Sequence, residues 1–273
     1  MVMLKRLERK LAEVQRWVDS VAALSDVPSA MALAFFRSRP AEGRGLLARL
    51  SRTIAPVVWV RPAALRGWSI RIEPEDLSQF VIYEEVFIEK VYDLERVTFA
   101  PDCIIDCGAF QGYFSLLAAS KFHTPVLAFE PNARNYDGLL ANIAANAAPI
   151  EARPHAVAAN DGVASFSGGG CGGRLGDGAD SVQVIVDNLC RIIHELAPQR
   201  LLLKLDIEGE ESHLLPALLP VLPSQTAIFF EWHHGRTSFV AVADELTRHG
   251  FSVTQTRANH ADAELYIDAF AQR

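Results

Sequence analysis

The sequence predicts an α/β fold that is built on a mostly parallel sheet, and three observations support this prediction. Nearly all-apolar segments recur from residue 103 onward, as parallel strands that are buried on both faces require. They alternate with segments of helical periodicity, which is typical of helices that cover a parallel sheet. The last two strand-like segments, residues 251–257 and 264–270, leave no room for a connecting helix, so we expect them to pair antiparallel.

Residues 1–96 are expected to form a basic helical extension and cap that precedes the main domain. Apolar residues recur at helical spacing over residues 4–24, and residues 44–54 predict a second, basic helix. Residues 1–72 hold 13 Lys and Arg against 5 Asp and Glu, which leaves 13 basic and 28 acidic residues for the rest of the chain. Such an arm could contact an anionic surface or form a homodimer through its apolar stripe, and a solvated helical face is the alternative.

The cysteines and the apolar segments indicate in which cellular compartment the protein is found. None of the four cysteines forms a Cys-x-x-Cys pair, and they read as free thiols of a reducing environment. No apolar run reaches the length of a membrane span, and the first residues run directly into charged ones, unlike a signal peptide. We therefore expect a cytoplasmic protein.

Residues 97–273 should form one domain, and its first half shows a clear order of elements. A strand at 103–106 precedes a helix that starts near residue 112, and a strand at 125–130 precedes a helix at 132–146. We expect residues 150–158 to be an edge strand, because Pro154 has no N–H to donate to a sheet.

The second half begins with a biased segment. Residues 167–178 are rich in glycine but lack the Gly-Lys-Ser/Thr ending of a phosphate loop, so they are either a passive loop or a lid over substrate. A helix is expected to begin at Asp187. Residues 201–206 and 227–232 are apolar strands, and the helix that follows them should end near Gly250.

Each strong strand ends in an acid: Asp106, Glu130, Asp206 and Glu231. In open α/β sheets ligands bind at the carboxyl ends of the strands, so these acids should meet around one site. Any single strand-end acid could instead cap the next helix. Four acids in series favour a ligand site.

The segment around Asp106 indicates which ligand. Asp106 precedes glycines at 108 and 112, so an acid stands where a dinucleotide site would accept pyrophosphate. An acid there suits a cation, and S-adenosylmethionine carries an ammonium and a sulfonium but no phosphate. Asp106 is placed to bind the ammonium, and Gly108 and Gly112 let the backbone approach the methionine part. Glu130 follows 24 residues after Asp106, where it can accept both ribose hydroxyls.

Together these motifs resemble the FkbM-type S-adenosylmethionine-dependent methyltransferases. The matching segments are residues 106–115, 129–132, 156–162, 204–211 and 230–233, and residues 204–211 follow the Lys-hydrophobe-Asp-hydrophobe-Glu-Gly-x-Glu signature that separates this family from other methyltransferases. The resemblance covers residues 97–270, and this chain departs from it at Phe110-Gln111 and in the Gly-rich segment.

The resemblance implies a Rossmann-like class I methyltransferase fold, with seven mostly parallel strands and an antiparallel final strand. It implies S-adenosylmethionine as cofactor, and methyl transfer to an oxygen of a sugar, polyketide or other small acceptor. The segment that contains Ala156 usually lies beside the adenine in this family. The residues assigned to cofactor binding are Asp106, Gly108, Ala109, Phe110, Gly112, Glu130, Pro131, Asn132, Ala156 and Asp206.

A hydroxyl acceptor also needs a proton acceptor or a metal. Candidates are Asp206, Glu208, Glu231 and His233. Our hypothesis is that neutral His233 takes the proton while Asp206 and Glu208 orient the acceptor. We assign no metal ligand, and a divalent cation on Asp206 and Glu208 is the alternative that we do not favour.

The expected partner is a small-molecule or glycan acceptor and not a nucleic acid. The alternative function is a non-catalytic, cofactor-binding regulatory or assembly subunit. A nicotinamide oxidoreductase is disfavoured by the acid ahead of the glycines.

Overall fold

The computed structural model describes residues 15, 18, 19, 22–24, 26, 29, 57–73, 76–168, 172–176, 178, 180–233, 235–258 and 267–273. Most of the helix expected at residues 4–24, and all of the helix expected at 44–54, lie outside the described residues. The basic arm therefore stays a prediction. The chain divides into two compact units, residues 1–90 and 91–273.

The described part of the first unit contains a small hairpin and a helix. Its elements are β1 (Val58–Val60), η1 (Ala63–Leu65), β2 (Ile70–Ile72), α4 (Leu77–Tyr83) and the π-helical η2 (Glu84–Glu89). Strands β1 and β2 pair antiparallel. Helix α4 begins where the Asp76 side chain accepts a hydrogen bond from the Ser78 N–H.

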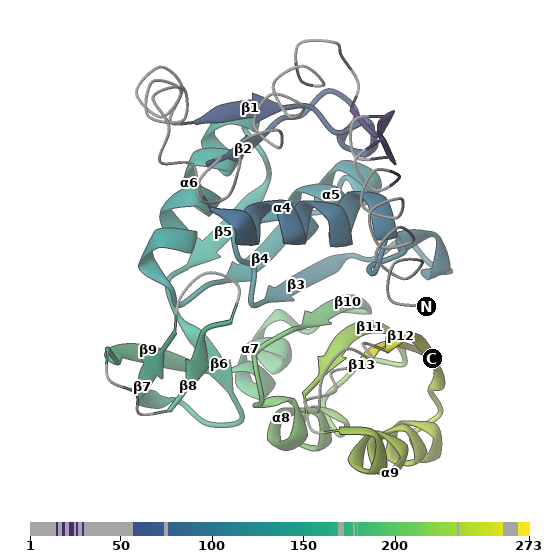
Figure 1. The fold of residues 1–273 in the computed structure, drawn as a ribbon. Coiled ribbons are helices and arrows are strands. Elements are labelled where there is room, and N and C mark those ends of the chain that lie inside the picture. Colours follow the sequence, from purple (N-terminus) through teal and green to yellow (C-terminus); the bar gives the residue numbers. More distant parts are fainter. Residues whose placement is uncertain are drawn as a thin grey trace, which may run out of the picture. The chain divides into compact units, whose positions relative to one another are not determined.

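The second unit is built on a seven-stranded sheet with the order β12-β13-β11-β10-β3-β4-β5 (Figure 1). These strands are β3 (Cys103–Cys107), β4 (Val126–Phe129), β5 (Ile150–Arg153), β10 (Arg200–Leu205), β11 (Gln225–Trp232), β12 (Ser252–Ala258) and β13 (Ile267–Gln272). Strands β3, β4, β5, β10 and β11 run parallel, whereas β13 is antiparallel to both β11 and β12. The predicted sheet, with its antiparallel final strand, is confirmed.

Helices cover both faces of this sheet (Figure 1). Helices α5 (Tyr113–Phe122) and α6 (Ala133–Asn146) lie on one face, and α7 (Leu189–Leu196), α8 (Glu211–Leu218) and α9 (Gly235–Arg248) lie on the other. The sequence analysis missed α8. The latter three helices share one core with the strands, in which Ile105, Leu203 and Phe230 are almost completely buried. A short 3-10 helix, η3 (Leu94–Arg96), precedes β3.

Two details of the predicted helices need correction. Helix α7 begins at Leu189 rather than at Asp187, because the Asn188 side chain accepts a hydrogen bond from the Arg191 N–H and caps the helix. The apolar periodicity of the two predicted helices also places Leu140 and Leu196 on the inward face. They are 42% and 48% exposed, so they do not face the core.

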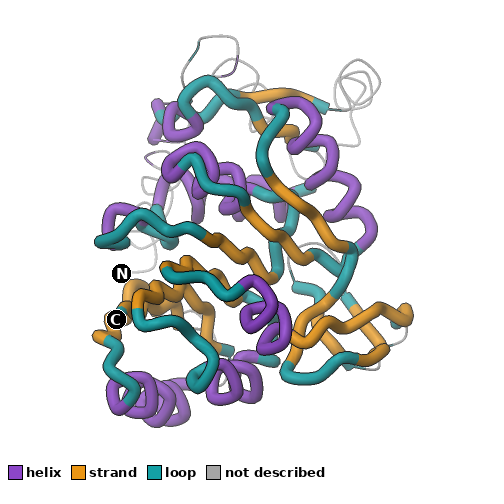
Figure 2. Tube along the Cα trace, turned by 180° about the vertical axis from the view of Figure 1, so that it is seen from behind, coloured by secondary structure: helices purple, strands orange, loops and turns teal. Residues whose placement is uncertain are grey.

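The single strand expected at residues 150–158 is two strands in two sheets. Pro154 separates β5, the edge strand of the large sheet, from β6 (Ala156–Ala158). Strand β6 belongs to a four-stranded sheet with the order β6-β9-β7-β8, which Figure 2 shows beside the large sheet. The other members are β7 (Gly162–Ser167), β8 (Arg174–Leu175) and β9 (Val182–Asn188). The described part of the Gly-rich segment therefore includes β8, a strand that pairs with β7, and is not a loop throughout.

The expectations of free cysteines and of no membrane-spanning helix concern the described residues. Cys103, Cys107 and Cys190 are free thiols, and the cytoplasmic location stays a prediction. Among the helices of the described residues, none is long and apolar enough to cross a membrane.

Candidate active site

The candidate site lies at the carboxyl ends of β3, β10 and β11, which are neighbours in the centre of the sheet. Parallel register places Lys204 opposite Asp106 and Leu205 opposite Cys107. Asp206 directly follows β10, and Glu231 lies near the end of β11. The predicted strand-end acids of these three strands therefore meet at one edge of the sheet.

Backbone contact joins the turns after β3 and β10. The Asp206 N–H donates to the Cys107 carbonyl over 3.2 Å. Gly108 has a φ of +79°, and a Cβ there would lie 1.8 Å from the Asp206 carbonyl oxygen. Only glycine fits this position, for its conformation and for its lack of a side chain.

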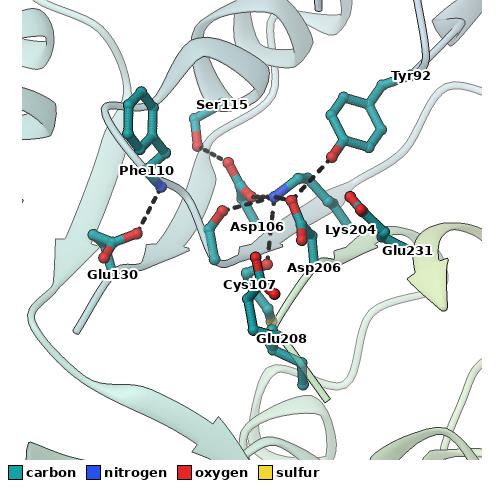
Figure 3. A network of polar contacts seen from close by, with 12 residues as sticks. Tyr92, Asp106, Cys107, Phe110, Ser115, Glu130, Lys204, Asp206, Glu208 and Glu231 are labelled. Carbon is teal, nitrogen blue, oxygen red and sulfur yellow. Dashed lines mark hydrogen bonds and ion pairs between the residues drawn. The ribbon is translucent and has the colours of Figure 1, made fainter. Parts of the chain in front are cut away.

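Lys204 is a buried cation at the centre of the site (Figure 3). Its Nζ lies 3.3 Å from Asp106 Oδ1 and 3.4 Å from Asp206 Oδ2, and it donates to the Gly108 carbonyl over 2.7 Å. Burial by itself would lower the pKa of Lys204, but the two carboxylates outweigh burial and raise it. Lys204 therefore stays charged and is paired with two acids.

The position of Lys204 gives Asp106 a partner within the protein. Asp106 is completely buried, and its Oδ2 accepts a 2.6 Å hydrogen bond from the Ser115 hydroxyl while its Oδ1 faces Lys204. The Lys204 ammonium thus pairs with the carboxylate that we expected to bind the ammonium of the cofactor, and cofactor binding by Asp106 stays a prediction. Through Lys204 and Ser115, Asp106 holds the turn that follows β3 and contains Gly108, here called the first Gly turn.

Asp206, by contrast, is partly exposed and faces the site. Its side chain is 22% exposed, and its Oδ2 accepts a 3.2 Å hydrogen bond from the Tyr92 hydroxyl. The Tyr92 ring centroid lies 5.4 Å from Lys204 Nζ, so Tyr92 contacts both members of the ion pair. Sequence reasoning missed Tyr92, because it lies outside every motif.

Glu130 links the first Gly turn to the turn after β4. Its carboxylate accepts a hydrogen bond from the Phe110 N–H over 2.7 Å (Figure 3). It accepts another from the Asn132 N–H over 2.9 Å. Burial raises the pKa of Glu130 to about 7, against the effect of these hydrogen bonds. Phe110 adopts a φ of +52°, which points its N–H at this carboxylate. The Asn132 side chain also caps α6.

The other predicted cofactor residues differ in where they lie. The N–H groups of Gly108 and Ala109 both donate to the Phe129 carbonyl, which holds the first turn against β4. Pro131 lies between Glu130 and the cap of α6. The side chain of Ala156 packs into the small core of the four-stranded sheet, so only its backbone stays a candidate for cofactor contact.

His233 lies among three carboxylates. Its Nε2 is 3.3 Å from Glu208 Oε2 and 3.5 Å from Glu231 Oε1, and its Nδ1 is 3.2 Å from Glu211 Oε1. The structure therefore brings together the predicted residues His233, Glu208 and Glu231, and it adds Glu211.

The charges around His233 argue against its proposed role as a base. Burial by itself would lower the pKa of His233, but the hydrogen-bonded carboxylates of Glu211 and Glu231 outweigh burial and raise the pKa to about 11. The imidazole therefore holds its proton at neutral pH, which corrects the hypothesis that neutral His233 takes the acceptor's proton. Burial raises the pKa of Glu208 to about 7 and that of Glu231 to about 8.

Glu211 is a functional candidate that sequence reasoning missed. It is completely buried and accepts hydrogen bonds from the Ile207 N–H over 3.1 Å and from the Gly209 N–H over 3.0 Å. These contacts hold the turn in which Glu208 adopts a φ of +54°. The sequence did hold a sign of its importance, because Glu211 is the last acid of the 204–211 signature. We assigned no role to that acid.

One arrangement at the site has metal-ligating residue types. Single ligand atoms of Asp206, Glu208 and His233 lie within 4.8 Å of one another. Two carboxylates and an imidazole are suited to a divalent cation, although the sequence analysis assigned no metal ligand.

One family model and several solved structures are similar to this chain. The family model described as "Methyltransferase FkbM domain" matches residues 106–253. Solved structures similar to this chain include precorrin-6y C5,15-methyltransferase from Geobacter metallireducens, with 13% identity, a TM-score of 0.43, and coverage of 67% of this chain and 86% of that one. Another is TYW2 from M. jannaschii in complex with AdoMet, with 11% identity, a TM-score of 0.46, and coverage of 80% and 85%. No curated protein matches the chain.

The family match spans more than half of the chain and includes the Gly turn, Glu130, Lys204 and the carboxylate cluster. The chain belongs to the FkbM methyltransferase family, and its methyl donor is S-adenosylmethionine.

Proposed function

We propose that this methyltransferase transfers the methyl group to a hydroxyl oxygen of a small-molecule or glycan acceptor. The observation that carries the proposal is the group of Asp206, Glu208 and Glu231 at adjoining strand ends, in contact with the first Gly turn through Asp206. A hydroxyl must lose a proton when it is methylated, and carboxylates beside the methyl donor can accept that proton.

The proposed reaction is an in-line displacement at carbon. The acceptor oxygen attacks the methyl carbon, the carbon–sulfur bond breaks, and S-adenosylhomocysteine leaves. The sulfonium is already a good leaving group, so the protein mainly aligns the two reactants. Glu231 in its ionised form is positioned to accept the hydroxyl proton, and this form becomes the major one as the pH rises through about 8. Asp206 and Glu208 orient the acceptor.

Glu231→Gln is expected to lower turnover by about 10²–10⁴, the range for loss of a positioned proton acceptor. Affinity for S-adenosylhomocysteine should stay nearly unchanged, because Glu130 and the Gly turn are untouched. Transfer of a radiolabelled methyl group to candidate sugars and polyketides measures turnover, and mass spectrometry locates the methyl group. Glu245→Gln on α9, whose side chain contacts Arg248 and His249, is the matched control.

Two results would contradict this proposal. One is a labelled methyl group on nitrogen or carbon of the acceptor. The other is a loss of less than tenfold in Glu231→Gln. Cofactor binding without transfer to any acceptor would instead support the non-catalytic alternative.

We also propose that Glu130 accepts the ribose hydroxyls of the cofactor, and this predicts a pH dependence. Its carboxylate form is the one that accepts two hydrogen bonds, and its pKa is raised to about 7. Affinity for S-adenosylhomocysteine should therefore fall as the pH drops through 7, by about tenfold between pH 8 and pH 6.

Calorimetry from pH 5.5 to pH 8 measures this dependence. Glu130→Gln keeps the shape of the side chain and removes the titration, so its affinity should be weaker by about 1.5–3 kcal/mol at pH 8 and independent of pH. A wild-type affinity that does not change with pH would show that Glu130 serves only to hold the Phe110 and Asn132 turns.

A further inference from the structure

We infer that Asp206, Glu208 and His233 bind a divalent metal ion of the manganese and magnesium class. This site deepens the proposed function, because the ion would lie where the acceptor meets the methyl donor. Its role in turnover rests on the proposed function, but the binding of the metal does not.

The spacing of the three side chains suits one ion. Their ligand atoms lie within 4.8 Å of one another, and Glu208 Oε2 is 3.3 Å from His233 Nε2. Ligands that sit about 2.0–2.3 Å from a common ion are about 3 Å apart when adjacent and about 4.5 Å apart when opposite. A small inward movement of one carboxylate therefore completes the arrangement. Carboxylate oxygens suit manganese and magnesium, and the imidazole nitrogen favours manganese of the two.

The orientation of His233 is a second, separate observation. A metal-bound histidine commonly donates its other ring N–H to a carboxylate, which fixes the tautomer and aims the free nitrogen at the metal. Here His233 Nδ1 faces Glu211, which is completely buried and held by the N–H groups of Ile207 and Gly209. His233 Nε2 is thereby directed toward Glu208 and Glu231, and a divalent ion bound there takes the place of the proton that Nε2 carries in the metal-free protein. Glu211 is a positioning residue in this arrangement.

Neighbouring groups give the ion a chemical role. Asp206 follows β10 and touches the turn at Gly108, so the ion would lie beside the methyl donor. The acceptor hydroxyl would occupy an open position on the ion, which lowers the pKa of that hydroxyl. Its proton passes to Glu231, which lies 3.5 Å from His233 Nε2. The resulting oxygen then attacks the methyl carbon as the carbon–sulfur bond breaks.

Titration of the full-length protein with Mn²⁺ alone tests the binding. Electron paramagnetic resonance should count one bound ion per chain without cofactor or acceptor. Glu208→Gln and Asp206→Asn should each weaken Mn²⁺ binding by at least tenfold, and Glu211→Gln should weaken it by about 10–100-fold. Competition by Mg²⁺ and Zn²⁺ then ranks the metals.

The matched control is Glu210→Gln. Glu210 precedes α8 and lies 3.7 Å from the exposed His213, so it is a neighbouring acid–histidine pair outside the cluster. Its loss should leave Mn²⁺ binding unchanged. Circular dichroism and thermal unfolding verify that each variant is folded. Glu208→Gln is the variant least expected to unfold, because Gln keeps the size and shape of the side chain and Glu208 is only partly buried.

The inference is overturned by the absence of Mn²⁺ binding at millimolar metal, or by binding that Glu208→Gln and Asp206→Asn leave intact. Methyl transfer that persists in EDTA, together with absent Mn²⁺ binding, would reject the metal and keep the proposed function. Mn²⁺ binding that these variants abolish, without methyl transfer to any hydroxyl, would keep the metal site and reject the proposed function.

Discussion

Replacing Lys204 with methionine should lower the free energy of unfolding by about 3–5 kcal/mol, the cost of breaking a buried ion pair by removal of one partner. Lys204 is 3% exposed and lies 3.3 Å from Asp106 and 3.4 Å from Asp206. Methionine fills similar space, so lost packing contributes little. The cost arises because Asp106 is left buried without its cation, and the Gly108 carbonyl loses its donor.

Urea unfolding followed by circular dichroism measures this loss. Lys121→Met is the control, because Lys121 pairs with Glu95, whose side chain is 86% exposed. A surface pair of this kind contributes about 0–1 kcal/mol. A loss of less than 1 kcal/mol in Lys204→Met would show that Asp106 and Asp206 are stabilised by other groups.

The partners of Lys204 illustrate what the sequence could and could not predict. A lysine in an all-apolar strand must find an acid, so a buried ion pair of Lys204 follows from the sequence alone. The register that places Lys204 opposite Asp106 could not be predicted, because strands β3 and β10 are separated by about a hundred residues of chain. For this reason Asp106 was assigned to the cofactor and was not identified as the partner of Lys204.

The fold could be predicted where strands are buried on both faces. Strands β3, β4, β10 and β11 have apolar runs that only a covered parallel sheet explains. The four-stranded sheet was missed, because β7 and β9 expose one face and carry a weaker pattern. Helix α8 was missed because Pro216, inside it, argues against a helix on sequence alone.

The carboxylate and histidine cluster of the candidate site was predicted as a set of residues, but the contacts within it were not. Asp206, Glu208, Glu231 and His233 all follow from the rule that sites form at carboxyl ends of strands. Their roles depend on distances between side chains, which no spacing in the sequence reveals. Glu211 helps to set the protonation state of His233 through its contact with Nδ1. This contact between Glu211 and His233 depends on α8, which begins directly after the turn at Glu208.

Gly108→Ala should abolish binding of S-adenosylhomocysteine and lower the free energy of unfolding by at least about 3 kcal/mol. A left-handed backbone costs a residue with a Cβ about 1–2 kcal/mol, and overpacking adds about 1–3 kcal/mol. The new Cβ would lie 1.8 Å from the Asp206 carbonyl oxygen, so the turns after β3 and β10 must separate. Separation of these turns displaces the turn at Gly108, which we expect to bind the cofactor, together with the carboxylates of Asp206 and Glu208.

Two other glycines separate the cost of backbone strain from the cost of steric overlap. Gly108, Gly112 and Gly250 have nearly the same φ and differ in what an added Cβ would meet. At Gly250, where φ is +86°, an added Cβ meets nothing within 4 Å, so Gly250→Ala should cost only the strain of about 1–2 kcal/mol and leave cofactor affinity unchanged. At Gly112, where φ is +81°, the Cβ would meet the flexible end of Leu139 at 2.4 Å, so the cost should be intermediate. Urea unfolding and calorimetry with S-adenosylhomocysteine measure both properties. Equal losses of stability in all three variants would mean that strain alone requires these glycines, and that the turns after β3 and β10 can separate without loss.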